Sequence, residues 1–134
     1  MKVLYIIIST LLMCSCVESE RETIISGQVV DKITGEPINT VCIAILGMKN
    51  YFLKGGEHVS TDMAEVDTEG QFYLTLKSKS IDDYLLRVYL KEDGNCDFNI
   101  EETEMLGYSC ITHNCNSLQV GKIHHVVVEV SLQD

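Results

Sequence analysis

The chain lacks an apolar run long enough to cross a bilayer as a helix. Its longest run, residues 3–13, has 11 residues, whereas a helix rising ~1.5 Å per residue needs about 20 to span a hydrocarbon core of roughly 30 Å. Basic residues are also scarce, because 10 Lys and Arg stand against 20 Asp and Glu, for a formal charge of −10. Such a surface repels phosphate backbones, so nucleic acid is not an expected partner. Low-complexity tracts, internal repeats and a long helical pattern are absent too.

The first residues have the pattern of a secretory signal peptide. Lys2 precedes the apolar run at 3–13, and small residues close it, which fits a signal better than a buried strand or helix of the domain. The closing letters LMCSC resemble the lipobox of bacterial lipoproteins, in which a small residue precedes an acylated cysteine. Ser15 is the small residue, so the resemblance implies a signal peptide over 1–15 and a lipid anchor on Cys16. Cleavage before Cys14 would place the bulky Met13 at the position that should be small, so Cys14 is the weaker choice.

An acidic segment follows the proposed anchor. We expect residues 16–23 to consist of the lipidated cysteine and an acidic tether that contains Glu18, Glu20 and Glu22. The segment resembles the export signal of Bacteroidetes-type surface lipoproteins, which implies a lipid-anchored protein at the outer membrane or cell surface; a plain solvated tether is the alternative. Without residues 1–15 the chain keeps 119 residues and a charge of −11, enough for one domain, over 24–134.

Apolar and polar residues alternate along most of this domain. The alternation runs over 23–47, 71–76, 84–91 and 124–132, and a period of two predicts half-buried strands. Gly35 and Pro37 mark a turn inside the first stretch, and Gly70 ends a turn that we interpret as a hairpin over 65–76. The pattern predicts an all-β, antiparallel sandwich. Predicted inward positions are Val41, Ile43, Ile45, Phe72, Leu74, Leu76, Leu86, Val88, Leu90, Val126, Val128, Val130 and Leu132.

Two stretches, GQVVDKITGEPINTVCIAILG (27–47) and VDTEGQFYLTL (66–76), resemble the carboxypeptidase regulatory-like domain. The resemblance implies a seven-stranded, transthyretin-like (prealbumin) β-sandwich. Thr40 stands where that family has Gly, and the segment 48–66 is longer than usual. The matching positions are Gly27, Val29, Asp31, Thr34, Gly35, Pro37, Ile38, Val41, Ile43, Ile45, Gly47, Asp67, Gly70, Phe72, Leu74 and Leu76.

The same resemblance implies a non-catalytic role as a structural or protein-interaction module in the cell envelope. The partner would be an envelope protein or a glycan, besides the membrane. Transthyretin-like hydrolases end in Tyr-Arg-Gly-Ser, whereas this chain ends VSLQD, and its histidines form no motif with a nucleophile or carboxylate. We therefore predict that the protein is not an enzyme and needs no cofactor.

Residues 92–121 form an insert with little strand pattern, and long loops of this kind are often functional. The insert has six acids, no Lys or Arg, and Cys96, Cys110 and Cys115. The first interpretation is a disulfide-closed loop. Cys42, Cys96, Cys110 and Cys115 allow three connectivities, and the sequence does not choose among them. Cys110 and Cys115 are close enough to pair across a short turn, and Cys96 could then reach Cys42. The side chain of Cys42 lies on the opposite side of its strand from Val41 and Ile43, and this side needs a cover that the insert could provide.

Two metal sites are alternative interpretations of the same insert. Asp93, Asn95, Asp97, Asn99, Glu101 and Glu104 follow the spacing of a calcium loop, although Phe98 stands where that loop needs Gly. A zinc site would use Cys110, His113, Cys115 and either His124 or His125. The insert is also the candidate surface for binding a glycan or peptide. Aromatic residues that could stack on a sugar are Tyr51, Phe52, Tyr84, Tyr89 and Tyr108.

Overall fold

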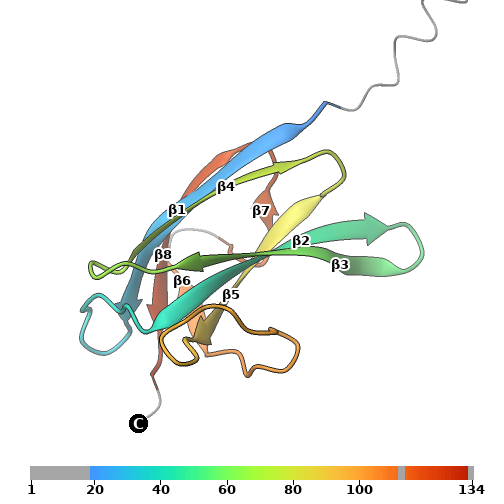
Figure 1. Cartoon of the computed structure of the whole chain (residues 1–134). Helices are drawn as coiled ribbons and strands as arrows, with labels where there is room; N and C mark the ends of the chain where they lie inside the picture. The colour runs from blue at the N-terminus through green and yellow to red at the C-terminus, as the bar shows by residue number, and fades with distance from the viewer. Residues whose placement is uncertain (1–18, 112–113, 133–134) are drawn as a thin grey trace, which may run out of the picture.

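The computed structural model describes residues 19–111 and 114–132, and every regular element in these ranges is a β-strand (Figure 1). The predicted all-β class is therefore confirmed. The predicted signal peptide and the predicted lipid anchor, Cys16, lie outside the described residues. The strands are β1 (Arg21–Asp31), β2 (Val41–Tyr51), β3 (Gly55–Glu65), β4 (Gln71–Ser78), β5 (Asp83–Leu90), β6 (Tyr108–Cys110), β7 (Leu118–Gln119) and β8 (Ile123–Val130).

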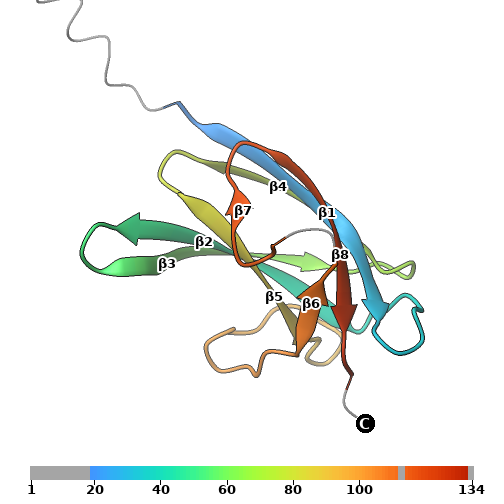
Figure 2. The same ribbon diagram turned by 180° about the vertical axis from the view of Figure 1, so that it is seen from behind.

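The strands form two four-stranded sheets that face each other as a sandwich (Figures 1 and 2). One sheet has the order β4-β1-β8-β6 and the other the order β3-β2-β5-β7. The predicted count of seven strands is wrong, because the described residues form eight, of which the short strands β6 and β7 lie in the insert. Five of the six strand pairs among the described residues are antiparallel, as predicted. The exception is the pair of β1 and β8, which is parallel from Ile24–Ile123 to Asp31–Val130.

The main core lies between the two sheets and is built by the predicted alternation. Val41, Ile43 and Ile45 of β2 are fully buried, as are Val126, Val128 and Val130 of β8. Each strand places every second side chain on the inner face, which is the geometry that period-two patterns describe. The predicted inward positions Leu90 and Leu132 are partly exposed: Leu90 is the last residue of β5, and Leu132 lies two residues beyond the end of β8.

The strand β3 was not expected, and it changes the interpretation of the turn that follows it. Its residues are almost all polar and exposed, so no alternation reveals it, yet it pairs with β2 from Cys42–Glu65 to Tyr51–Gly55. The predicted hairpin over 65–76 is wrong because β3 and β4 belong to different sheets. The turn itself is ordered, since Asp67 Oδ1 accepts hydrogen bonds from the amides of Glu69 and Gln71, both at 2.9 Å.

Within the described part of the chain, we find no helix with the length and apolar character needed to cross a membrane.

Candidate functional site

The first half of the insert lies against the outer face of the β3-β2-β5 sheet (orange loop in Figure 1). We call residues 91–107 the strap. It begins with a tight turn in which Glu92 and Asn95 exchange backbone hydrogen bonds of 3.0 and 2.8 Å. Asp93 and Gly94, the central residues of this turn, both have positive φ (50° and 75°), the combination that a type I′ turn requires.

Two contacts fix the strap to the sheet. Cys96 forms a disulfide with Cys42 of β2, with Cα atoms 5.8 Å apart. Phe98 packs its ring edge against Tyr89 of β5, with ring centroids 5.9 Å apart. Under the strap lies a second, smaller core of fully buried residues, Ala44, Leu46 and Tyr89, against which Phe98, Ile100, Met48, Met63 and Leu85 pack. The strap is therefore the cover that the apolar outer face of β2 needs.

The strap also supplies a polar outer surface. Phe98 and Ile100 pack against the sheet. All six carboxylates of the strap are exposed: Glu92, Asp93, Asp97, Glu101, Glu102 and Glu104. The insert thus separates into an inner face that completes the fold and an acidic outer face held in place by a disulfide. Solvated carboxylates at this density create a negative field that favours a basic partner.

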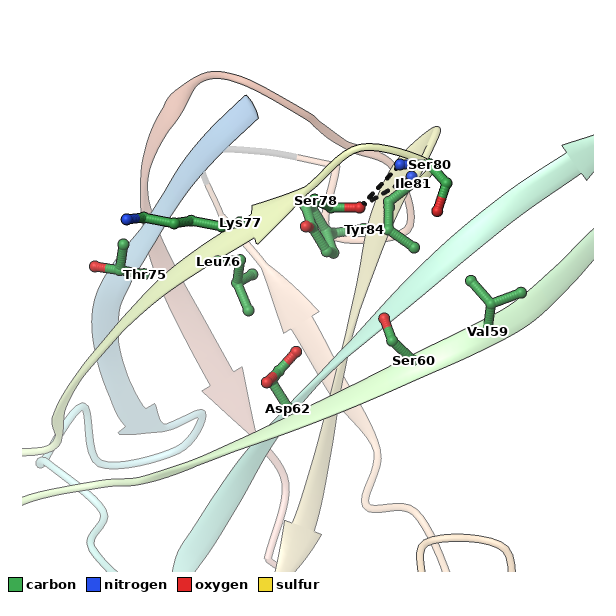
Figure 3. A pocket seen from close by; sticks show the side chains of 10 residues that line it. All are labelled: Val59, Ser60, Asp62, Thr75, Leu76, Lys77, Ser78, Ser80, Ile81 and Tyr84. Carbon is green, nitrogen blue, oxygen red and sulfur yellow. Dashed lines mark hydrogen bonds between the residues drawn. The ribbon is translucent and has the colours of Figure 1, made fainter. Parts of the chain in front are cut away.

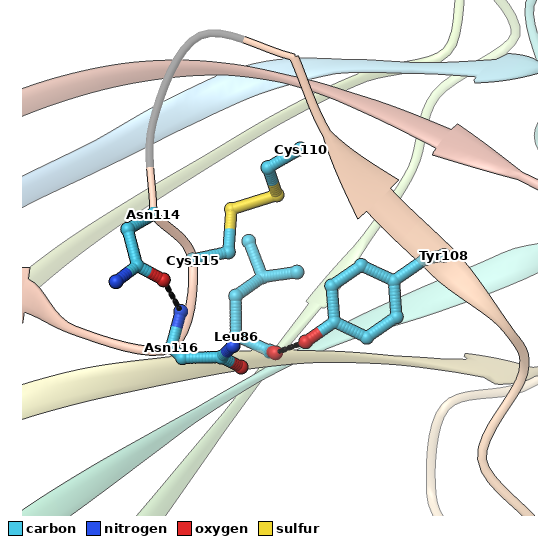
Figure 4. Close-up of a disulfide and its surroundings, with 6 residues drawn as sticks. All are labelled: Leu86, Tyr108, Cys110, Asn114, Cys115 and Asn116. Atoms are coloured by element: carbon cyan, nitrogen blue, oxygen red, sulfur yellow. Dashed lines mark hydrogen bonds between the residues drawn. A yellow bond between two sulfur atoms is a disulfide. The ribbon is translucent and has the colours of Figure 1, made fainter.

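The second half of the insert covers the open edge of β5. Cys110 and Cys115 form a disulfide, with Cα atoms 6.1 Å apart, and Cys115 is buried in the main core. Leu86 of β5 donates its amide hydrogen to the Cys115 carbonyl oxygen at 2.8 Å, and its own carbonyl oxygen accepts the Tyr108 hydroxyl (Figure 4). Burial raises the pKa of Tyr108 above its usual value, and the nearby positive charge of Arg87 opposes this shift.

The remaining length of the β5 edge is covered in the same way. Leu106 of the strap donates its amide hydrogen to the Val88 carbonyl oxygen at 2.9 Å, and β7 pairs with Asp83 and Tyr84 at the other end. An uncovered strand edge is a template for pairing with other chains. Residues 92–121 therefore protect a sheet edge that would otherwise be open.

The disulfide interpretation of the insert agrees with the structure, which pairs Cys42 with Cys96 and Cys110 with Cys115. The zinc interpretation is wrong as framed, because Cys110 and Cys115 are not free thiolates. His113 lies outside the described residues. His124 Nε2 is 2.8 Å from the Gln119 carbonyl oxygen, and His125 Nδ1 is 3.2 Å from Ser26 Oγ.

Three residues of the calcium template, Asp93, Asn95 and Asn99, take part in turns of the strap. Asp93 and Asn95 belong to the first turn, and Asn99 Oδ1 accepts the amide hydrogen of Glu101 at 3.1 Å. Phe98, at the position where the template needs Gly, is an apolar anchor. In residues 19–111 and 114–132, no three His, Cys, Asp or Glu side chains come together as a metal site.

The candidate sugar-stacking aromatics do not form one surface. Tyr84 lies in the main core and Tyr89 in the second core, on opposite faces of β5, and both are almost fully buried. Tyr108 is half-buried, while Tyr51 and Phe52 lie at the tip of the β2–β3 hairpin. A site built from all five is therefore excluded.

A pocket of about 340 Å³ opens between the edge strands β3 and β4 (Figure 3). Asp62 and Ser60 of β3 line it, Tyr84 lies at its base, and Lys77 points away from Asp62. Burial raises the pKa of the Tyr84 phenol, and the Asp62 carboxylate raises it further, whereas a hydrogen bond with Thr23 and the charge of Arg21 act in the opposite direction. Sequence reasoning missed this pocket because β3 shows no alternation.

A scan against models of known protein families finds no match to this chain, and neither does a search of curated proteins.

Proposed function

We propose that the protein is a lipid-anchored lipoprotein of the bacterial cell envelope, of the Bacteroidetes type, with a transthyretin-like domain. Its sandwich acts as a structural or protein-interaction module and not as an enzyme. Cys16 carries the lipid at the outer membrane or cell surface, and residues 17–23 tether the domain. The partner is an envelope protein with a basic contact surface.

One observation carries this proposal: the strap presents six exposed carboxylates on a segment that Cys96 and Phe98 fix to the sheet. A fixed loop loses little conformational entropy on binding, so its charges are already arranged for a partner. The inner side chains of both sheets are used in the cores. This leaves the outer surface as the part of the domain that meets other molecules.

The anchor is tested by expressing the full chain in a Gram-negative host and measuring the intact mass of the membrane-bound protein. We expect cleavage after Ser15 and acyl chains on Cys16. A Cys16→Ser variant should lose the acyl mass, whereas Cys14→Ser should keep it. A mature chain with any other N-terminus, or without acyl groups, contradicts the anchor.

The interaction role is tested with a photo-crosslinking residue at Glu101 in the membrane-anchored protein. We expect one defined adduct that disappears when Glu92, Asp97 and Glu104 are all changed to Gln. Direct binding of a glycan, a peptide or calcium by the insert is the competing function. Such a ligand raises the melting temperature of the domain, and a calcium-dependent rise abolished by Asp93→Ala would replace the interaction module with a calcium site.

A further inference from the structure

The end of the sandwich that carries the first described residues differs from the rest of its surface. We call residues 19–23, 48–59, 77–83 and 117–123 the tether end. Hydrogen bonds join these segments: Asp82 donates its amide hydrogen to the Met48 carbonyl oxygen at 2.9 Å, and the Arg21 guanidinium donates to the Ile81 carbonyl oxygen at 3.3 Å. In Figures 1 and 2 the start of β1, the β4–β5 turn and the tip of the β2–β3 hairpin lie at the same end of the molecule.

Among the described residues, three of the four most exposed large apolar side chains lie at this end, and the fourth is Ile33 in the β1–β2 turn. Phe52 at the hairpin tip is 100% exposed, Leu53 beside it 89%, and Ile123 at the start of β8 78%. Nothing in the fold requires a Phe-Leu pair at this turn, because neither side chain packs against the described residues. Large apolar groups concentrated on a projecting element mark an interaction site.

The charge of the tether end also departs from the chain average. Among the described residues, the tether end has six basic and five acidic side chains, and the rest of the domain has three basic and thirteen acidic ones. Lys49 and Lys54 flank the apolar tip directly. The basic residues of this end are Arg21, Lys49, Lys54, Lys77, Lys79 and Lys122.

We propose that the tether end is a membrane-docking surface, with Phe52 and Leu53 inserted among the lipids and the flanking lysines at anionic headgroups. Aromatic and aliphatic side chains bordered by Lys suit the interface between hydrocarbon and water. Lys and Arg near an anionic leaflet are attracted to it. The strongly acidic remainder of the domain is repelled by the same leaflet and points away from it.

The position of the anchor favours this contact, and in this respect the inference rests on the proposed function. Cys16 is five residues before Arg21, and an extended chain of five residues spans at most about 18 Å. The bilayer is therefore always within reach of the tether end, and a tethered surface needs only weak intrinsic affinity to stay bound. Docking sets the orientation of the domain, with the acidic face of the strap directed away from the lipid.

The test uses the chain from Cys16 to residue 134, which contains every described strand and both disulfides. Cys16 is the one cysteine of this segment outside those disulfides, so it can be coupled to a maleimide lipid in phosphatidylglycerol vesicles. The chain has no Trp. Phe52→Trp therefore gives a single reporter at the tip, and Ile33→Trp gives a matched control, because Ile33 is 89% exposed in the β1–β2 turn at the other end.

We expect the emission of Phe52→Trp to shift to shorter wavelength and to be quenched at least twofold by spin-labelled lipids, with no change for Ile33→Trp. Adding Leu53→Asp and Lys54→Glu to Phe52→Trp should remove the quenching, and phosphatidylcholine vesicles should reduce it. An unquenched Phe52→Trp, or equal quenching of Ile33→Trp, overturns the proposal. Because Cys16 is coupled to the lipid chemically, this result does not depend on acylation of Cys16 in the cell. Absence of docking would therefore not contradict the lipid anchor, and absence of acylation in the cell would not contradict docking.

Discussion

The Cα atoms of Cys42 and Cys96 lie 5.8 Å apart although 54 residues separate them in the sequence. Cys110 and Cys115 are separated by only 5 residues. A disulfide stabilises chiefly by restricting the unfolded chain, and its effect grows with the enclosed loop. The two bonds of this domain therefore differ in their expected contribution to its stability.

We predict that replacing both Cys42 and Cys96 by Ala lowers the free energy of unfolding by about 4 kcal/mol, and that the same change at Cys110 and Cys115 lowers it by about 2 kcal/mol. Urea denaturation of the two double variants beside the parent chain measures both values. A larger loss for the Cys110 and Cys115 pair would contradict the prediction that the Cys42–Cys96 disulfide stabilises the fold more.

Phe98 should hold the strap independently of the disulfide. Its ring is half-buried against Tyr89, so Phe98→Ala should cost about 1–3 kcal/mol, less than the 3–5 kcal/mol typical of a fully buried ring. Hydrogen exchange should accelerate at the Leu106 amide while the β1 and β8 amides keep their protection. Phe52→Ala is the matched control and should leave stability unchanged, because Phe52 is fully exposed; uniform loss of protection in Phe98→Ala would disprove a local role.

Two glycines with nearly equal backbone angles should respond differently to Ala. Gly35 and Gly70 have φ of 73° and 76°, a conformation that costs an L-residue about 1–2 kcal/mol. A Cβ at Gly35 meets nothing within 4 Å, whereas one at Gly70 would lie 2.6 Å from the Val29 carbonyl oxygen. We expect Gly70→Ala to lose about 1–3 kcal/mol more than Gly35→Ala in thermal or urea denaturation. Equal losses of stability in the two variants would mean that the backbone at Gly70 shifts to accommodate the added Cβ without cost, which would contradict the prediction.

The buried phenols make stability depend on pH in the alkaline range. The pKa values of Tyr84 and Tyr108 are raised in the folded protein, in both cases mainly by burial, whereas an unfolded chain ionises tyrosine near pH 10. The folded state thus keeps protons that the unfolded state loses. The contribution of the two protonated phenols to the free energy of unfolding is complete below about pH 10, and it is lost as the pH rises through their folded pKa values.

Urea titrations between pH 8 and 11 check this prediction. Tyr108→Phe should make the alkaline fall in stability shallower, and at neutral pH it should cost about 1 kcal/mol for the lost hydrogen bond to the Leu86 carbonyl oxygen. Tyr73→Phe is the control, since Tyr73 is exposed on β4, and should leave the slope unchanged. A parent protein whose stability stays constant to pH 11 would contradict the argument.

The sequence predicts the long strands well because alternation records which side of a sheet each residue occupies. That signal covers β1, β2, β4, β5 and β8, but it fails for β3, whose side chains are mostly exposed except near its C-terminal end. Alternation also says nothing about which strand is the neighbour. The parallel pairing of β1 with β8 and the separation of β3 from β4 into different sheets depend on contacts across the whole chain.

The candidate site was predictable only in part. An even number of cysteines suggested the two bonds, and the position of Cys42 on the opposite face of its strand from Val41 and Ile43 suggested a cover. The anchoring role of Phe98 was hidden because Phe98 also fell within the spacing of a calcium template. The exposed Phe52 and Leu53 stood in a segment without strand pattern, where sequence alone does not distinguish a projecting tip from a packed turn.

The parallel pairing of β1 with β8 also constrains when the protein can fold. Ser26 and His125 face each other in this pair although they are 99 residues apart, so the first strand waits for the last one before its sheet can close. Folding that depends on such distant contacts is slow. A chain still leaving the ribosome can pair its first strand with β4, but it completes this sheet only after β8 is made, near the end of synthesis.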